Sequence, residues 1–361
     1  MSATPSEEKP TTLNRSVLLQ AWAQLSVYDQ TATRLKRRFI NQRYWVIVLT
    51  LIATVASVAA GVVGALGQVW LTAFFAVLSI TLPIVGSYLM NDIIKFTGGT
   101  TWIKYRYIAE TMRMHIYLYR MKAPPYDAEP VRKRDDLLGN NLRKVREEID
   151  LNEVIPFDIR QPKDEAEIKA VIAAANRYTR DDNGLDEIAL GQYLKWRVLD
   201  QREWYEGRVQ DDFKRLKNSY RLAQGALLGG ALISALAGLI DVQVLWLVAI
   251  TNAVSVALTT SANVSMFGAT YSLFQAAALR LSDELVAWLA LADNPELDEP
   301  MARAAAEAAF AARIEDVLLW ERKSWYELAI QVQTTSDQTI LSSLARITKE
   351  DQNRRSGRRS G

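Results

Sequence analysis

Paired stretches without any charged side chain occur at two places in this chain, and they constrain its fold more than any other feature. Residues 44–66 and 69–90 are separated by Gly67 and Gln68, and residues 222–240 and 242–262 by Asp241 alone. A helix rises about 1.5 Å per residue, so about 20 apolar residues cross a hydrocarbon core of about 30 Å. The sequence therefore predicts two transmembrane helical hairpins, whose outer turns are too short to hold a domain.

Basic residues flank these hairpins on one side only. They precede the first stretch, follow the second and precede the third, whereas neither outer turn contains a Lys or Arg. Loops rich in Lys and Arg stay on the cytoplasmic side of a membrane. We therefore expect the N-terminus, the central region and the C-terminus to be cytoplasmic. The residues concerned are Arg34, Lys36, Arg37, Arg38, Arg43, Lys95, Lys104, Arg106, Lys214, Arg215, Lys217 and Arg221.

The two hairpins also align with each other without a gap, at an offset of 177 residues. Tyr28 then falls on Tyr205, Arg38 on Arg215 and Gly61 on Gly238. This alignment predicts an all-α membrane protein with two tandem repeats, each a two-helix transmembrane hairpin with long cytoplasmic helical extensions. The predicted parts are a disordered N-terminal tail at 1–14, a first repeat at 15–150, a linker at 151–163, a second repeat at 164–335 and a basic C-terminal tail at 336–361.

Helical periodicity continues on the cytoplasmic side of both hairpins. Apolar residues recur every three or four positions, and Pro or Gly marks the ends. The expected helices are one that starts near Gln20 and runs into the first span, then 101–121, 135–149, 165–180, 188–240, 265–291 and 301–333.

The residue types exclude several classes of function. The chain has no cysteine and a single histidine, His115, so thiolate and multi-histidine metal sites are impossible. It lacks a phosphate-binding loop, a nucleophile elbow and paired carboxylates inside a span. Residues 181–184 (DDNG) resemble the start of a calcium loop but lack the downstream glutamate. We expect no enzymatic activity, no cofactor, no bound metal and no nucleic-acid partner.

Small residues recur at four-residue steps in the first and third spans. Such residues let membrane helices approach closely, either between repeats or subunits or within one hairpin. The candidate packing residues are Ala53, Ser57, Gly61, Gly225, Gly229, Gly230, Ser234 and Gly238.

Polar residues share one face of the fourth span. Thr251, Asn252, Ser255 and Thr259 follow each other at steps of one, three and four residues. A polar group in the bilayer needs a hydrogen-bond partner. These residues are therefore candidates either for the lining of a water-filled pore or for hydrogen bonds between helices and with their own backbone.

Aromatic and charged residues form a third set, on the cytoplasmic side. Arg106 and Glu110 are four residues apart and can pair on a helix. The set either binds a nucleotide by stacking and by arginine contacts, or packs long helices together. Its members are Trp102, Tyr105, Arg106, Glu110, Tyr126, Asp200, Trp204, Tyr205, Glu321 and Trp325.

Three segments of this set carry a resemblance to a known family. WIKYRYIAE at 102–110 followed by Pro125-Tyr126-Asp127, DQREWY at 200–205 and EDVLLWERKSW at 315–325 resemble SLATT domains, the SMODS- and SLOG-associating two-transmembrane effector domains. The chain resembles a tandem pair of them over about residues 15–335.

The resemblance implies a bacterial effector in the cell inner membrane. It implies pore formation or membrane disruption when a separate cytosolic sensor reports infection through a nucleotide signal, and it implies no catalytic residues. Four helices per chain cannot enclose a wide channel, so a pore requires a homo-oligomer in the lipid bilayer. The alternatives are a non-conducting membrane scaffold for a cytosolic partner and a housekeeping ion channel.

Overall fold

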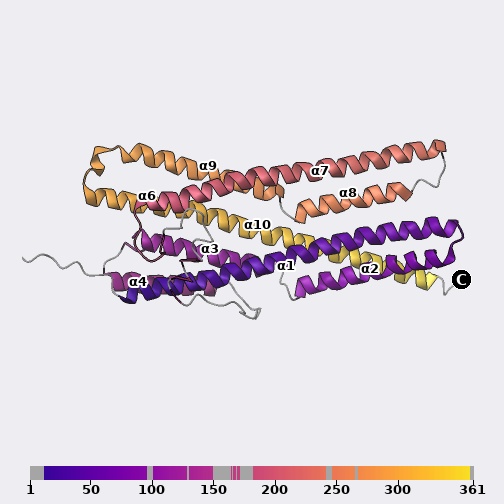
Figure 1. The fold of residues 1–361 in the computed structure, drawn as a ribbon, viewed down its shortest axis with the longest axis horizontal. Helices are drawn as coiled ribbons and strands as arrows, with labels where there is room; N and C mark the ends of the chain where they lie inside the picture. Colours follow the sequence, from indigo (N-terminus) through magenta and orange to yellow (C-terminus); the bar gives the residue numbers. More distant parts are fainter. Residues whose placement is uncertain are drawn as a thin grey trace, which may run out of the picture. The chain divides into compact units, whose positions relative to one another are not determined.

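The computed structural model describes residues 12–95, 101–127, 130–148, 164, 166–167, 169–170, 182–240, 246–264 and 267–357 (Figure 1). Every regular element within these residues is a helix. The predicted all-α class is thereby confirmed for the described part of the chain. The predicted linker at 151–163, the break near Gly98 and the turn at Asp241 lie outside the described residues.

The first hairpin consists of α1 (Thr12–Ala65) and α2 (Val69–Lys95). No proline interrupts α1, and its two glycines, Gly61 and Gly64, lie near its end. Gly67 then has a φ of 75°, a conformation that glycine adopts without strain. The backbone amide of Gln68 donates to the Val63 carbonyl at 3.3 Å, and the backbone amide of Gly67 donates to the Gly64 carbonyl at 3.0 Å. These two hydrogen bonds form a Schellman motif at the end of α1. α1 begins at Thr12, within the segment 1–14 that was predicted as an N-terminal tail.

Two helices follow the predicted first hairpin. They are α3 (Thr101–Arg120) and α4 (Val131–Glu148). Proline at 124 and 125 cannot continue a helix, and α3 ends just before them, close to the predicted end at 121.

The segment predicted as one helix at 188–240 is helical from residue 190 onward, but it is not a single regular α-helix. It comprises α6 (Leu190–Tyr193), a π-helical turn η1 (Leu194–Leu199) and α7 (Asp200–Ile240). In the π turn, the three consecutive residues Trp196, Arg197 and Val198 are all buried. A regular helix with one buried face does not bury three residues in a row, which is why the apolar periodicity did not predict this turn.

The remaining helices are α8 (Trp246–Val264), α9 (Phe267–Ala292), a 3-10 turn η3 (Pro295–Leu297) and α10 (Pro300–Gly357). Asn294 lies between α9 and η3 and caps the start of η3. Its side chain accepts a hydrogen bond from the backbone amide of Glu296 at 3.0 Å. α10 extends well beyond the predicted end at 333, through most of the predicted basic tail. No Pro or Gly occurs between 301 and 356, so nothing in the sequence terminates the helix earlier.

The chain divides into two compact units that do not follow the predicted repeats. Unit 1 comprises Met1–Arg38, Thr101–Asp211 and Thr270–Trp325, and unit 2 comprises Phe39–Thr100, Asp212–Ala269 and Tyr326–Gly361. Each unit takes segments from both predicted repeats. The predicted cytoplasmic helices of both fall mainly in unit 1, and both predicted hairpins fall in unit 2.

α3 is the most deeply buried helix of unit 1. Ile103, Ile108, Met112 and Ile116 are fully buried along it. The ring of Tyr105 lies 5.7 Å from that of Tyr28 in α1, and Tyr117 lies 6.1 Å from Tyr193 in α6. Aromatic pairs at this distance add to the apolar burial, so α3 connects helices from the start and the middle of the chain.

Unit 2 carries large apolar side chains on its surface. Among the described residues, two helices are long and apolar enough to cross a membrane, Val17–Ala65 and Val69–Leu89, and Leu247–Thr259 is a shorter apolar helix. Trp70 is 89% exposed. This agrees with the predicted first hairpin. The second hairpin and the tandem repeat stay predictions, because residues 241–245 lie outside the described part of the chain.

Candidate functional site

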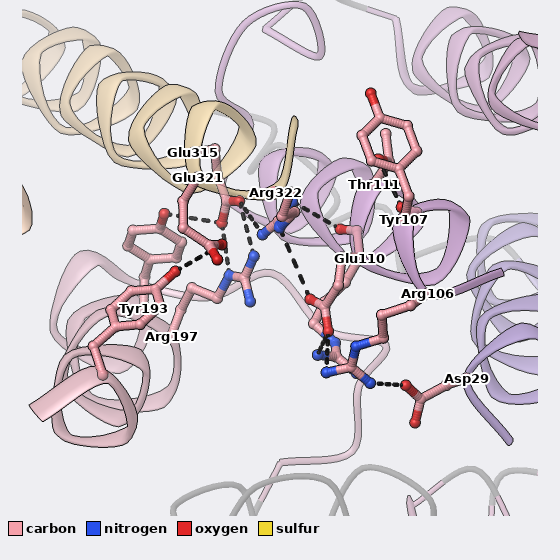
Figure 2. A network of polar contacts seen from close by, with 12 residues as sticks. Asp29, Arg106, Tyr107, Glu110, Thr111, Tyr193, Arg197, Glu315, Glu321 and Arg322 are labelled. Atoms are coloured by element: carbon pink, nitrogen blue, oxygen red, sulfur yellow. Dashed lines mark hydrogen bonds and ion pairs between the residues drawn. The ribbon is translucent and has the colours of Figure 1, made fainter. Parts of the chain in front are cut away.

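A network of charged side chains, most of them buried, lies in unit 1 and includes Arg106, Glu110 and Glu321 of the predicted cytoplasmic set (Figure 2). Glu110 in α3 is its first centre. Arg106 lies 2.7 Å from the Glu110 carboxylate and Arg113 lies 2.8 Å from it, which confirms the predicted pairing of Arg106 with Glu110. Arg322 of α10 donates to the Glu110 backbone carbonyl at 2.9 Å.

The charge state of Glu110 follows from this surplus of guanidinium groups. Burial alone would raise the pKa of Glu110, but Arg113, Arg106 and Arg322 outweigh it and hold the pKa well below its usual range. Glu110 is therefore ionised at any physiological pH. Arg106 also pairs with Asp29 of α1, so the network reaches that helix as well.

Glu315 in α10 is the second centre. Arg197 donates from Nε to Oε1 at 2.8 Å and from Nη2 to Oε2 at 3.0 Å, and the Tyr193 hydroxyl donates to Oε1 at 3.1 Å. Arg322 lies 3.6 Å from Oε2. Burial opposes ionisation, yet Arg197 keeps the pKa of Glu315 below its usual value. Arg322 therefore joins the two centres, because it contacts both Glu110 and Glu315.

Glu321 differs from these two acids. Its side chain is buried, and its carboxylate accepts a hydrogen bond from the Tyr205 hydroxyl at 3.0 Å. Burial raises the pKa of Glu321 to about 7, although Arg322 and the Tyr205 hydrogen bond act in the opposite direction. Within the network, this carboxyl group is the one that changes charge near neutral pH.

Aromatic members of the predicted set pack around the network. The rings of Trp102 and Trp325 lie 5.4 Å apart, and Trp204 lies 5.1 Å from Phe274 in α9. These contacts favour the packing interpretation of the set over nucleotide stacking. Asp200 begins α7 directly after the π turn.

Tyr126 is not part of this network. It lies with His115 and Asn141, whose side chains are 2.9 Å and 3.0 Å from its hydroxyl. Burial lowers the pKa of His115 to about 4, so the histidine is neutral at pH 7 and serves as a hydrogen-bonding partner.

Residues 182–184, the described part of the DDNG segment, form a structural loop. Arg120 at the end of α3 donates two hydrogen bonds to the Asp182 carboxylate, at 2.9 Å and 2.6 Å, and a third to the Asp186 carbonyl at 2.8 Å. The Asp182 carboxylate also accepts from the Gly184 amide at 2.9 Å. Within the described residues, no group of acids or histidine is arranged to hold a metal ion.

In unit 2, the structure brings one small residue together with the predicted polar face. A Cβ at Gly230 of α7 would overlap the Thr251 hydroxyl of α8, whereas Gly225 and Gly229 face open space. The Thr251 and Thr259 hydroxyls donate to their own backbone, at the carbonyls of Val248 and Ser255. This arrangement favours packing within the hairpin for Gly230 and Thr251.

The other small residues do not share one buried face. Ala53 is buried, whereas Ser57, Gly61 and Ser234 are exposed. Gly238 lies in α7, but its surroundings are outside the described residues.

Sequence reasoning did not single out Arg197, Tyr193, Glu315 or Arg322. Glu315 and Arg322 stand inside the segment at 315–325 that carries the family resemblance. Arg197 stands between Trp196 and Val198, where an arginine interrupts an apolar run. A charged residue between apolar neighbours was the signal from which a buried ion pair could have been predicted, because a buried charge needs a partner of opposite charge.

Two known families match two separate segments of the chain. A family described as a protein of unknown function (DUF4231) matches residues 23–133. The family described as SMODS and SLOG-associating 2TM effector domain 1 matches residues 193–325. Residues 193–325 are thus similar to a SLATT domain. This confirms the predicted resemblance for residues 193–325, which contain Arg197, Glu315, Glu321 and Arg322. No match to a curated protein or to a solved structure was found.

Proposed function

We propose that this protein is a bacterial membrane effector that oligomerises and permeabilises the inner membrane when a cytosolic signal reaches unit 1. The observation that carries the proposal is the combination of a SLATT region with exposed apolar helices in unit 2. A soluble protein rarely exposes apolar patches of more than a few hundred Å². The description of the matched family as a two-transmembrane effector domain supports the same function.

The proposed signal acts on unit 1, where the buried charges are. A separate cytosolic chain that reads a nucleotide signal would supply it, as the words SMODS- and SLOG-associating in the family description suggest. Charges buried in one network are strongly destabilised when a single partner is withdrawn. A partner that draws one charged group out of the network would therefore loosen the helices that the network connects. We propose no catalytic role for any residue.

Membrane location and permeabilisation are tested separately. The full chain is expressed in bacterial cells, and membranes are extracted with alkaline carbonate. We expect the protein to stay in the pellet. Membrane potential is then followed with a voltage-sensitive dye at rising expression, because high concentration favours assembly without the signal. Protein in the pellet with no depolarisation at any level, with or without a co-expressed nucleotide-synthesising sensor, would rule out permeabilisation.

A non-conducting scaffold is the second candidate. It is favoured by the Thr251 and Thr259 hydroxyls, which bond their own backbone and so need no water. The double variant Asn252→Leu, Thr259→Leu distinguishes the two functions. A scaffold in this variant stays in the membrane pellet and conducts neither with nor without the substitutions, whereas a pore lined by α8 loses conductance.

A further inference from the structure

The helix α8 has two faces with opposite surroundings. One face packs within unit 2, where Ser255 is 4% exposed and Thr251 lies against Gly230. The other face carries Ala249, Asn252 and Val256, all of them exposed, with Val256 at 65%. The second face is therefore largely uncovered by the described part of the chain, although the Asn252 Oδ1 atom lies 3.9 Å from the position of a Cβ at Gly230.

Asn252 is the unusual member of this exposed face. Its side-chain amide makes no hydrogen bond to any part of the chain that the structure describes, although it lies inside the apolar stretch Leu247–Thr259. An amide offers two donors and one acceptor oxygen. In hydrocarbon, each unsatisfied polar group costs several kcal/mol. Once α8 is in a membrane, the Asn252 amide needs a partner that the described residues do not supply.

The spacing of the face indicates what that partner is. Ala249, Asn252 and Val256 follow each other by three and four residues, which is the a and d spacing of two helices that pack along a seam. The small Ala249 side chain permits close approach. Asparagine is also complementary to itself, because each amide donates to the carbonyl oxygen of the other. A single asparagine at such a position fixes register and oligomeric state in paired helices.

We propose that a second copy of this chain covers the exposed face of α8, with Asn252 of each copy hydrogen-bonded to the other. The proposal rests on the membrane location proposed above and names the surface through which the effector assembles. It assigns Asn252 to the subunit interface, and Thr251 and Ser255 to packing within one chain.

Cysteine cross-linking tests the interface directly, because the chain has no cysteine of its own. Val256→Cys places a thiol on the proposed seam, and Ser255→Cys places one a single residue away on the packed face. Membranes with either variant are oxidised with copper phenanthroline and run on non-reducing gels. We expect at least about tenfold more covalent dimer for Val256→Cys, and the same yield after tenfold dilution with lipid in reconstituted vesicles.

The role of the amide is tested in the Val256→Cys background. We expect Asn252→Leu to lower the dimer yield several-fold and Asn252→Gln to retain most of it, since Gln keeps the amide. Equal cross-linking of the two cysteine variants, or a yield unaffected by Asn252→Leu, would overturn the proposal. Ala249→Cys repeats the test on the same seam if Val256→Cys does not insert.

Carbonate extraction of the same membranes distinguishes a failure of the proposed interface from a failure of the proposed membrane function. Protein in the pellet without seam-specific cross-links contradicts the interface and leaves the membrane function standing. Protein in the supernatant contradicts the membrane function itself.

Discussion

The substitution Glu315→Gln removes one negative charge from the centre of unit 1 and nearly nothing else. The Glu315 side chain is 1% exposed and that of Arg197 is 4% exposed. The guanidinium would keep its charge, but it would lose the carboxylate to which it donates at 2.8 Å and 3.0 Å. Removing one partner of a buried pair costs about 3–5 kcal/mol, because the other charge stays buried without compensation.

This magnitude converts into a measurable melting temperature. For a domain of about 150–250 residues, 1 kcal/mol shifts Tm by roughly 2–4 °C. We therefore expect Glu315→Gln to lower Tm by about 6–20 °C. The assay is thermal unfolding of the full chain in detergent, followed by tryptophan fluorescence.

Asp316 provides the matched control. It is the next residue of α10 and is exposed, so Asp316→Asn should change stability by less than about 0.5 kcal/mol. The double variant Arg197→Met, Glu315→Leu should recover part of the loss, because it removes the stranded Arg197 charge, while Arg322 and the Tyr193 hydroxyl still lose Glu315 as a partner. A Tm for Glu315→Gln within about 2 °C of wild type would refute the reasoning that Arg197 depends on this carboxylate.

Three further perturbations follow from the same structure. Glu321 has a folded pKa of about 7 against an ordinary value of 4.5, so the folded state binds the proton more tightly. Wild-type stability should fall relative to Glu321→Gln by on the order of 3 kcal/mol between pH 4.5 and pH 7, measured as Tm against pH. Gly230→Ala should weaken the α7–α8 packing because its Cβ would overlap Thr251, measured as Tm or as protease resistance of the hairpin in detergent. Arg120→Met should cost about 3–5 kcal/mol by leaving Asp182 buried without its partner, measured as Tm.

Each of these three has a control or a contradicting outcome. Wild type and Glu321→Gln with parallel pH profiles would show that the carboxyl does not titrate in this range. Gly229→Ala meets open space, and an equal effect of both glycine substitutions would exclude the overlap as the cause. Lys122→Met breaks only an exposed ion pair, with side chains 48% and 56% exposed, and should cost less than about 1 kcal/mol.

The long helices were predictable from local sequence. The absence of Pro, and of Gly before Gly61, indicated α1, and Pro124 indicated the end of α3. The pairing of Arg106 with Glu110 was also predictable, because residues four apart on a helix are neighbours. These features depend on residues that are close in the sequence.

The centre of the candidate site was not predictable in this way. Glu110 and Arg322 are 212 positions apart, and Arg197 reaches Glu315 across 118 positions. Local periodicity contains no information about such pairs. The π turn at 194–199 added a second obstacle, because it buries Arg197 together with both of its neighbours, which the 3.6-residue period of a helix with one buried face does not predict. The division into units was missed for the same reason, since each unit combines segments from both halves.

The distance between Glu110 and Arg322 has a consequence for synthesis of the chain. A ribosome adds about 5–20 residues per second, so Arg322 appears roughly 10–40 s after Glu110. During this interval α3 carries an acid that the finished fold buries. Arg106 and Arg113 lie on the same helix and are made almost together with Glu110, so they can neutralise it from the start. The nascent helix thus holds its own counter-charges until the last partner arrives from the other end of the protein.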